Sequence, residues 1–321
     1  MPRLSYTKAL NRALGDELER DDAVCVFGED IGAGIAQLTL GLLKRFGPDR
    51  VVDTPLSEQA FTSMATGAAL CGMRPVIEFQ IPSLLFLTFE QIANQAHKMS
   101  LMTGGQVHVP VTYVVPGSGS REGWAGQHSD HPYPVFGHVG VKTVMPATPA
   151  DAYGLLVSAI RDDDPVVVFA PTGAMNVRDD LDFATLGPVP IGRGRIHRAG
   201  TDVTVVAAGH LVHDALAVAD DLDGEISVEV FDPRTIYPFD WDLLLASAEK
   251  TRRLVVIDDS NRFSGLGAEV IASVTEQIPL AALPRRVSRP DGAVLPFALE
   301  LDRAVQPGRD QLVTAIRTVL K

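Results

Sequence analysis

Short apolar runs alternate with longer amphipathic stretches through the first half of the chain. The runs have the length of buried strands, and the stretches between them have helical periodicity. This order is typical of a parallel sheet covered by helices. The predicted strands are residues 23–27, 51–52, 75–79, 109–115, 142–145 and 165–169.

The best-defined helix of this half is predicted over residues 151–161. Thr148 and Pro149 precede it, and Asp151 lies in its first turn, where an acid complements the exposed amide groups. The run of aspartates that ends at Pro165 breaks the helix before the next strand.

A second block of the same kind follows a stretch rich in Gly, Pro and Asp. Residues 171–200 lose the periodic pattern and predict a linker. Beyond it, the predicted strands are residues 203–209, 227–231 and 254–257, and the predicted helices pass through residues 215–219 and 268–277. The sequence therefore predicts an α/β protein of two domains, residues 1–185 and 186–321, each a mainly parallel sheet flanked by helices.

Composition and charge exclude several classes of protein. The 321 residues carry a net charge of -12, which argues against nucleic acid or an anionic membrane as a partner. No run approaches the roughly 18 consecutive apolar residues of a membrane helix, and the first residues lack the apolar core of a signal peptide. We therefore expect a cytoplasmic protein. Cys25 and Cys71 lie in apolar segments and are predicted to be small core residues.

One carboxylate stands at a junction between a strand and a helix. Glu58 lies between the strand at residues 51–52 and a helix of small residues predicted over 60–72. Open α/β sheets bind ligands at such junctions. Two interpretations stay open on this evidence, a site-facing acid or a solvated first-turn acid that complements the helix dipole.

Further motifs follow in a fixed order along nearly the whole chain. They are Gly28-Glu29-Asp30-Ile31-Gly32, residues 53–58, Gly72-Met73-Arg74-Pro75, residues 89–98, Gly126-Gln127-His128-Ser129, residues 145–152 and Phe263-Ser264-Gly265-Leu266-Gly267-Ala268-Glu269. This series resembles the β subunit of the thiamine-diphosphate-dependent first component of 2-oxo acid dehydrogenase complexes. The resemblance implies a pyrimidine-binding domain followed by a C-terminal domain like that of transketolase.

The resemblance also implies that this chain holds only half of a cofactor site. Related enzymes bind the diphosphate through Mg²⁺ with a Gly-Asp-Gly run and an Asn-Asn pair, and both are absent from this sequence. A diphosphate still needs a cation and amide donors. We therefore expect the Mg²⁺ ligands to come from an α subunit in an α2β2 heterotetramer, and the acyl product to pass to a lipoyl-bearing carrier.

The half expected here binds the aminopyrimidine ring. By resemblance Glu58 hydrogen-bonds a ring nitrogen and favours the imino tautomer that removes the C2 proton of the thiazolium. Leu56 and Gln80 match positions that line the ring, and Leu84 stands where relatives place an aromatic residue. Glu29 is either an acid that faces the site or a charge that leads into a helix.

His128 matches a histidine that assists proton transfer during acyl transfer in the related enzymes. An imidazole suits that step because its pKa lies near the operating pH. The alternative is a loop histidine in a polar turn. His97 and His138 also match family positions, and we expect structural places for both.

A monovalent cation is the last ligand that the resemblance implies. Ala159, Ile160, Asp162 and Asp164 match a loop at which relatives hold potassium, largely through backbone carbonyl oxygens. The alternative is a helix end crowded with acids.

Departures from the family pattern gather around the site and leave the substrate open. The Gln-Ser that usually follows the His-Ser pair is here Asp130-His131. The leading function is oxidative decarboxylation of a 2-oxo acid with acyl transfer to a lipoyl carrier. A second hypothesis is a transketolase-like subunit that moves a two-carbon ketol unit from a sugar phosphate to a carrier protein, which His131 would suit. A third is a non-catalytic scaffold subunit.

Overall fold

The apolar runs of the first half form one sheet in the computed structural model, which describes residues 3–120, 122–182 and 185–321. Its order is β12-β6-β7-β5-β4-β2-β3, and every neighbouring pair is parallel except β12 with β6. The strands are β2 (Val24–Gly28), β3 (Val51–Asp53), β4 (Arg74–Glu78), β5 (Thr112–Ser118), β6 (Lys142–Val144), β7 (Val166–Pro171) and β12 (Thr235–Tyr237). All six strands predicted in the first half are confirmed.

Helices cover both faces of this sheet, because alternate residues of a strand point to opposite sides. Val24 and Val26 belong to the core formed with α1 (Tyr6–Arg20) and α7 (Pro149–Arg161). Phe27 belongs to the opposite core, which includes residues of α3 (Glu58–Leu70) and α6 (Tyr133–His138). The remaining helical segments of this half are α2 (Leu42–Phe46), α4 (Leu84–Leu87), a π-helix (Gln91–Ala96) and α5 (His97–Met102).

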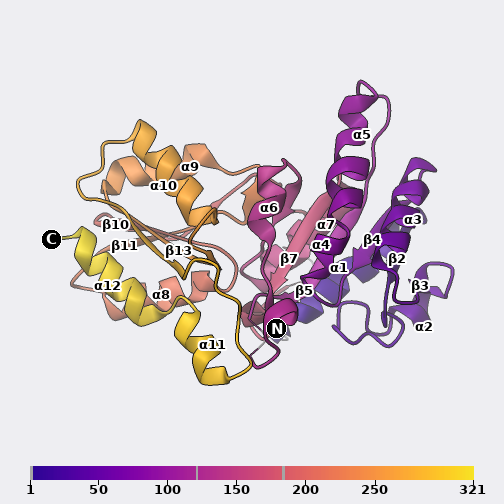
Figure 1. Ribbon diagram of the computed structural model, residues 1–321, viewed down its shortest axis with the longest axis horizontal. Helices are drawn as coiled ribbons and strands as arrows, with labels where there is room; N and C mark the ends of the chain where they lie inside the picture. The colour runs from indigo at the N-terminus through magenta and orange to yellow at the C-terminus, as the bar shows by residue number, and fades with distance from the viewer. Residues whose placement is uncertain (1–2, 121, 183–184) are drawn as a thin grey trace.

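The second block forms a five-stranded sheet in the order β14-β13-β10-β11-β9. Its strands are β9 (Arg195–Arg198), β10 (Val203–Ala207), β11 (Val228–Asp232), β13 (Leu254–Asn261) and β14 (Arg285–Arg289), and only β9 is antiparallel to its neighbour. Figure 1 shows α9 (Trp241–Thr251) and α10 (Leu266–Gln277) above this sheet, with α8 (Leu211–Asp221) and α12 (Arg309–Val319) below it. The helix α11 (Leu299–Val305) leads into α12.

The two blocks share a strand pairing and a hydrophobic core. Strand β12 comes from the second block but pairs with β6 of the first sheet. The segment predicted as a linker contains β9 and β8 (Arg178–Asp180), which pairs with β1 (Arg3–Ser5). One hydrophobic core also runs through both blocks, with Phe169 of β7 and Phe231 of β11 among its buried members. The segment predicted as a linker thus contains two short strands that the sequence did not predict.

A local sequence signal explains the start of α7. The hydroxyl of Thr148 accepts a hydrogen bond from the amide of Asp151 at 3.1 Å and so caps α7 at the predicted start of the helix.

The two cysteines have different environments. Cys25 is buried as predicted, but Cys71 is exposed. Cys71 directly follows the last residue of α3 and is exposed there, so its prediction as a core residue was wrong. In the described part of the chain, every helix is too short or too polar to cross a membrane.

Candidate active site

Two carboxylates meet at the carboxyl edge of the first sheet. Glu29 directly follows β2, and Glu58 begins α3, which follows β3. Because β2 and β3 are parallel neighbours, their carboxyl ends lie side by side. The side chains of Glu29 and Glu58 are close enough that Glu58 raises the pKa of Glu29. The structure thus joins two residues that the sequence could only propose separately.

The environment changes the acidity of Glu29. Its pKa rises from 4.5 to about 7, first because it is buried and then because the carboxylate of Glu58 is adjacent, while the backbone amide of Ser57 acts in the opposite direction. A carboxyl group with such a pKa carries a proton for much of the time at neutral pH. Oε1 of Glu29 is buried without a hydrogen-bond partner among the described residues, so a ligand could satisfy it.

Gln80 connects this pair to a third carboxyl group. Its amide nitrogen donates to the backbone oxygen of Glu29 at 3.1 Å and to Oε1 of Glu78 at 2.7 Å. Glu78 is the last residue of β4 and is 1% exposed. Burial raises its pKa to about 7, against opposing hydrogen bonds from Gln80 and Thr39. Three acids therefore lie under one edge of the sheet, two of them with a raised pKa.

The two leucines predicted to line the ring have different environments. Leu56 lies between β3 and α3 and is 81% exposed, which leaves an apolar surface two residues before Glu58. Leu84 begins α4 and is half-buried against the core shared by both blocks. Of these two leucines, Leu56 is therefore the one with an open apolar surface.

His128 lies on a separate turn that faces the second block. It belongs to a 3₁₀ turn (Gly126–Ser129), is half-buried, and makes an edge contact with Trp124 at a ring-centroid distance of 5.7 Å. The turn lines an open pocket of about 610 Å³, and the other wall comes from the second block. The pocket residues are Gly123, Trp124, Ala125, Gly126, Gln127, His128, Val294, Leu295 and Phe297.

The structure does not join the two predicted catalytic residues directly. Among residues 3–120, 122–182 and 185–321, no hydrogen bond or ring contact links His128 to Glu58. His97 begins α5, and burial lowers its pKa, whereas His138 ends α6.

The loop predicted to hold potassium already has cationic partners. Arg74 donates to the carbonyl oxygens of Ile160 at 3.2 Å and of Asp162 at 2.9 Å. Lys142 donates to the carboxylates of Asp162 at 2.8 Å and of Asp164 at 3.1 Å. Ala159 is buried at the end of α7. The cationic side chain of Lys142 therefore already offsets the negative charges of Asp162 and Asp164.

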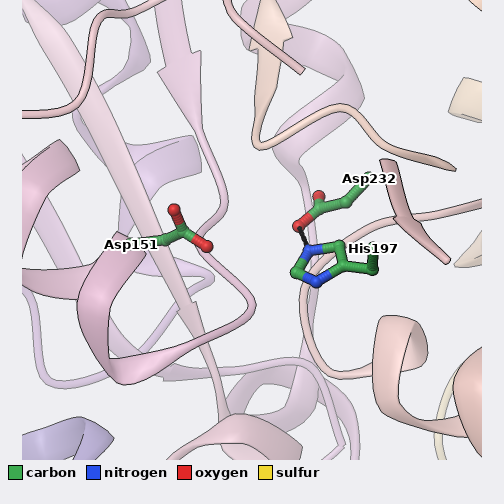
Figure 2. Close-up of side chains that lie close together, drawn as sticks. All are labelled: Asp151, His197 and Asp232. Atoms are coloured by element: carbon green, nitrogen blue, oxygen red, sulfur yellow. Dashed lines mark hydrogen bonds and ion pairs between the residues drawn. The ribbon is translucent and has the colours of Figure 1, made fainter. Parts of the chain in front are cut away.

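A second cluster has the composition of a metal site, and Figure 2 shows it. Asp151, His197 and Asp232 each offer a ligand atom within 4.8 Å of the others, and His197 bonds Asp232 at 3.0 Å. The guanidinium of Arg234, however, bonds Oδ1 of Asp151 at 3.0 Å, and its backbone amide bonds Oδ1 of Asp232 at 2.8 Å. Cationic and amide partners already satisfy these acids, so we interpret the cluster as an ionic contact between the two blocks.

Sequence reasoning missed the environment of His131. This ring is buried, and it bonds Asp259 at 2.9 Å and Ser118 at 3.3 Å. Asp259 lies 128 positions away in the chain, so no local signal points to the contact. His131 therefore does not face the pocket beside His128.

Comparison with known proteins agrees with this arrangement. The family model of the transketolase pyrimidine binding domain matches residues 3–177, and that of the transketolase C-terminal domain matches residues 192–312. A solved structure described as a split gene transketolase, an inactive β4 tetramer, aligns with a TM-score of 0.79 at 21% identity over 99% of both chains. That likeness concerns the fold.

Curated relatives match over almost the full length. The chain is 35% identical to the pyruvate dehydrogenase E1 component subunit beta of Rickettsia felis, over 99% of this chain and 98% of the relative. It is 37% identical to the acetoin:2,6-dichlorophenolindophenol oxidoreductase subunit beta of Cupriavidus necator, over 99% and 98%. It is 38% identical to the 3-methyl-2-oxobutanoate dehydrogenase subunit beta of Mycobacterium tuberculosis, over 99% and 92%. The chain therefore belongs to the β subunits of the thiamine-diphosphate-dependent first component of 2-oxo acid dehydrogenase complexes, which act together with an α subunit.

Proposed function

We propose that this chain contributes the pyrimidine-binding half of the active site in the oxidative decarboxylation of a 2-oxo acid, and that Glu58 binds the aminopyrimidine ring. The contact between Glu29 and Glu58 at the carboxyl edge of the sheet carries the proposal. When bound, thiamine diphosphate supplies the nucleophilic carbon and the electron sink for decarboxylation. The protein residues position it and move protons.

Glu29 and Glu58 suit a shared proton next to a weakly basic ring nitrogen. A protonated Glu29 can donate a hydrogen bond to the carboxylate of Glu58, which accepts a second hydrogen bond from the ring. The buried Oε1 of Glu29 is a further polar atom available to the ligand. Gln80 fixes the backbone at Glu29, and Leu56 and Leu84 supply apolar contacts to the ring.

His128 supplies acid–base chemistry on the other side of the site. It is half-buried in a pocket that remains open, so a substrate can reach its imidazole. We assign it to proton transfer after the 2-oxo acid has added, including acyl transfer to a lipoyl-bearing carrier.

The remaining ligands bind at the α subunit or at a loop of this chain away from Glu58. The Mg²⁺ ion and diphosphate are held by the α subunit in an α2β2 heterotetramer, since the Gly-Asp-Gly and Asn-Asn motifs are absent here. We propose that potassium binds at the loop of Ala159, Ile160, Asp162 and Asp164 through carbonyl oxygens, of which those of Ile160 and Asp162 also accept from Arg74. The domains divide near residue 185, and the complex acts in the cytoplasm.

The structure favours this function over the two alternatives. The transketolase-like hypothesis used His131 as a donor to a hydroxylated substrate, but that ring is buried and bonded to Asp259. A scaffold subunit has no need for a raised pKa at Glu29 beside Glu58.

The test separates the roles of the two catalytic residues in the complex assembled with the α subunit. Glu58→Gln cannot take the ring proton, so hydrogen–deuterium exchange at C2 of the thiazolium should slow by on the order of 10²–10⁴-fold. His128→Ala should leave that exchange intact and slow acylation of the carrier by a similar factor. Glu276→Gln, at an exposed position of α10, is the matched control. Equal slowing of C2 exchange in both variants, or normal carrier acylation with His128→Ala, would refute the assignment.

A further inference from the structure

We propose that His131 and Asp259 are positioning residues, which hold the turn that carries His128 against the second block. The inference rests on the role proposed above for His128. It assigns to the second block a part in positioning a catalytic residue of the first.

The contact between these residues is buried and joins the two blocks. Nδ1 of His131 lies 2.9 Å from Oδ2 of Asp259, with side chains 0% and 4% exposed. Asp259 belongs to β13 in the second sheet, whereas His131 follows the His128 turn by two residues. Nε2 of His131 lies 3.3 Å from the hydroxyl of Ser118 at the end of β5. His131 therefore ties the turn both to its own sheet and to the other.

Electrostatics fixes the direction of this hydrogen bond. Burial alone would raise the pKa of Asp259, but His131, with smaller effects of His210 and Arg289, lowers the pKa below its ordinary value. Asp259 is therefore ionised and can only accept, so Nδ1 of His131 carries the hydrogen. Burial lowers the pKa of His210, which therefore stays neutral beside the pair.

Other contacts hold both ends of the same turn. Tyr133 donates its hydroxyl to Asp258, the neighbour of Asp259, and so anchors the chain after the turn. The amide of Gly126 donates to the carbonyl oxygen of Leu295 at 2.8 Å and anchors its start. Every one of these partners belongs to the second block.

The backbone of the turn needs such support. Ala125 has a φ of 53°, in the left-handed region that an alanine rarely adopts, and Gly126 has a φ of 32°. A strained conformation persists only when its surroundings determine it. Without the His131–Asp259 contact, we expect His128 to lose its fixed position while the core of each block remains folded.

The experiment uses the complex assembled with the α subunit and three variants at the contact. His131→Leu removes the donor, Asp259→Asn removes the charged acceptor, and His131→Asn keeps a donor near the position of Nδ1. A misplaced catalytic group costs on the order of 10–100-fold, and we expect that loss in carrier acylation for His131→Leu and Asp259→Asn. C2 exchange should change less than about twofold, and His131→Asn should restore most of the transfer rate.

Combination with His128→Ala separates positioning from general damage. Residues that act through His128 cause no further loss once His128 is removed. The control is His197→Gln at the other buried histidine–aspartate pair, 3.0 Å from Asp232, which should leave transfer unchanged.

Three results decide the matter. Additive losses in the double variants, or normal transfer with His131→Leu, overturn the positioning role and leave the proposed function intact. Normal transfer with His128→Ala alone overturns both. If His131→Leu does not assemble, Asp259→Asn, which keeps the shape of the side chain, carries the same test.

Discussion

Glu78 should make the stability of this protein fall as the pH rises. The carboxyl group is 1% exposed, and its pKa rises from 4.5 to about 7. Between these values the folded protein binds a proton that the unfolded chain has lost, so the free energy of unfolding decreases with pH. One pKa unit corresponds to about 1.4 kcal/mol, so the shift corresponds to roughly 3 kcal/mol over the whole range.

The perturbation that isolates this contribution is Glu78→Gln. Glutamine keeps an oxygen that can accept from Gln80, as Oε1 of Glu78 does at 2.7 Å, but it cannot ionise. The free energy of unfolding of the original protein, minus that of the variant, should therefore drop by roughly 3 kcal/mol between pH 4.5 and pH 7.5. It should be level below pH 4.5.

Urea unfolding of the isolated chain over that pH range provides the measurement. Glu249→Gln, at an exposed position of α9, is the control and should not change the pH dependence. A difference between the original protein and Glu78→Gln that stays constant within about 0.5 kcal/mol would show that Glu78 ionises normally. A difference that grows with pH would contradict the sign of the argument.

Three further predictions concern the isolated chain. Gly28→Ala should lower the free energy of unfolding by about 1–3 kcal/mol, because a Cβ there would lie 2.7 Å from the carbonyl oxygen of Glu78. Gly67→Ala, in α3 with nothing within 4 Å of the added carbon, should raise it by about 0.5–1 kcal/mol. Thermal unfolding of both variants checks the pair, and the same sign for both would refute the reasoning. Titration calorimetry should detect no binding of thiamine diphosphate with Mg²⁺ at micromolar or tighter affinity, and such binding would contradict the shared site.

Sequence patterns predict strands β2 and β3 and the acids that follow them because both depend on local order. Strands β2 and β3 begin as short apolar runs; Glu29 directly follows β2, and Glu58 follows β3 after the connection of residues 54–57. In a parallel sheet that placement brings their side chains to one edge whatever the rest of the chain does. The raised pKa of Glu29 depends first on its burial, which is a tertiary property, and then on this proximity to Glu58.

Contacts between distant segments could not be predicted in this way. His131 looks like a polar loop residue until Asp259 is placed beside it. Strand β12 has three residues and carries no periodic signal, and β14 is rich in arginine. Cys71 has apolar neighbours in sequence but lies where a helix ends. These features depend on tertiary packing, which overrides local propensity.

Because β12 pairs with β6, the first domain of the family does not contain every strand of its own sheet and is not expected to fold independently. A fragment that ends before Thr235 would lack β12 and leave one side of β6 (Lys142–Val144) unpaired, and an open strand edge is a template for another chain. We expect such fragments to self-associate, which light scattering would detect. The intact chain should instead melt in one cooperative step, because neither sheet can lose its fold without opening the other.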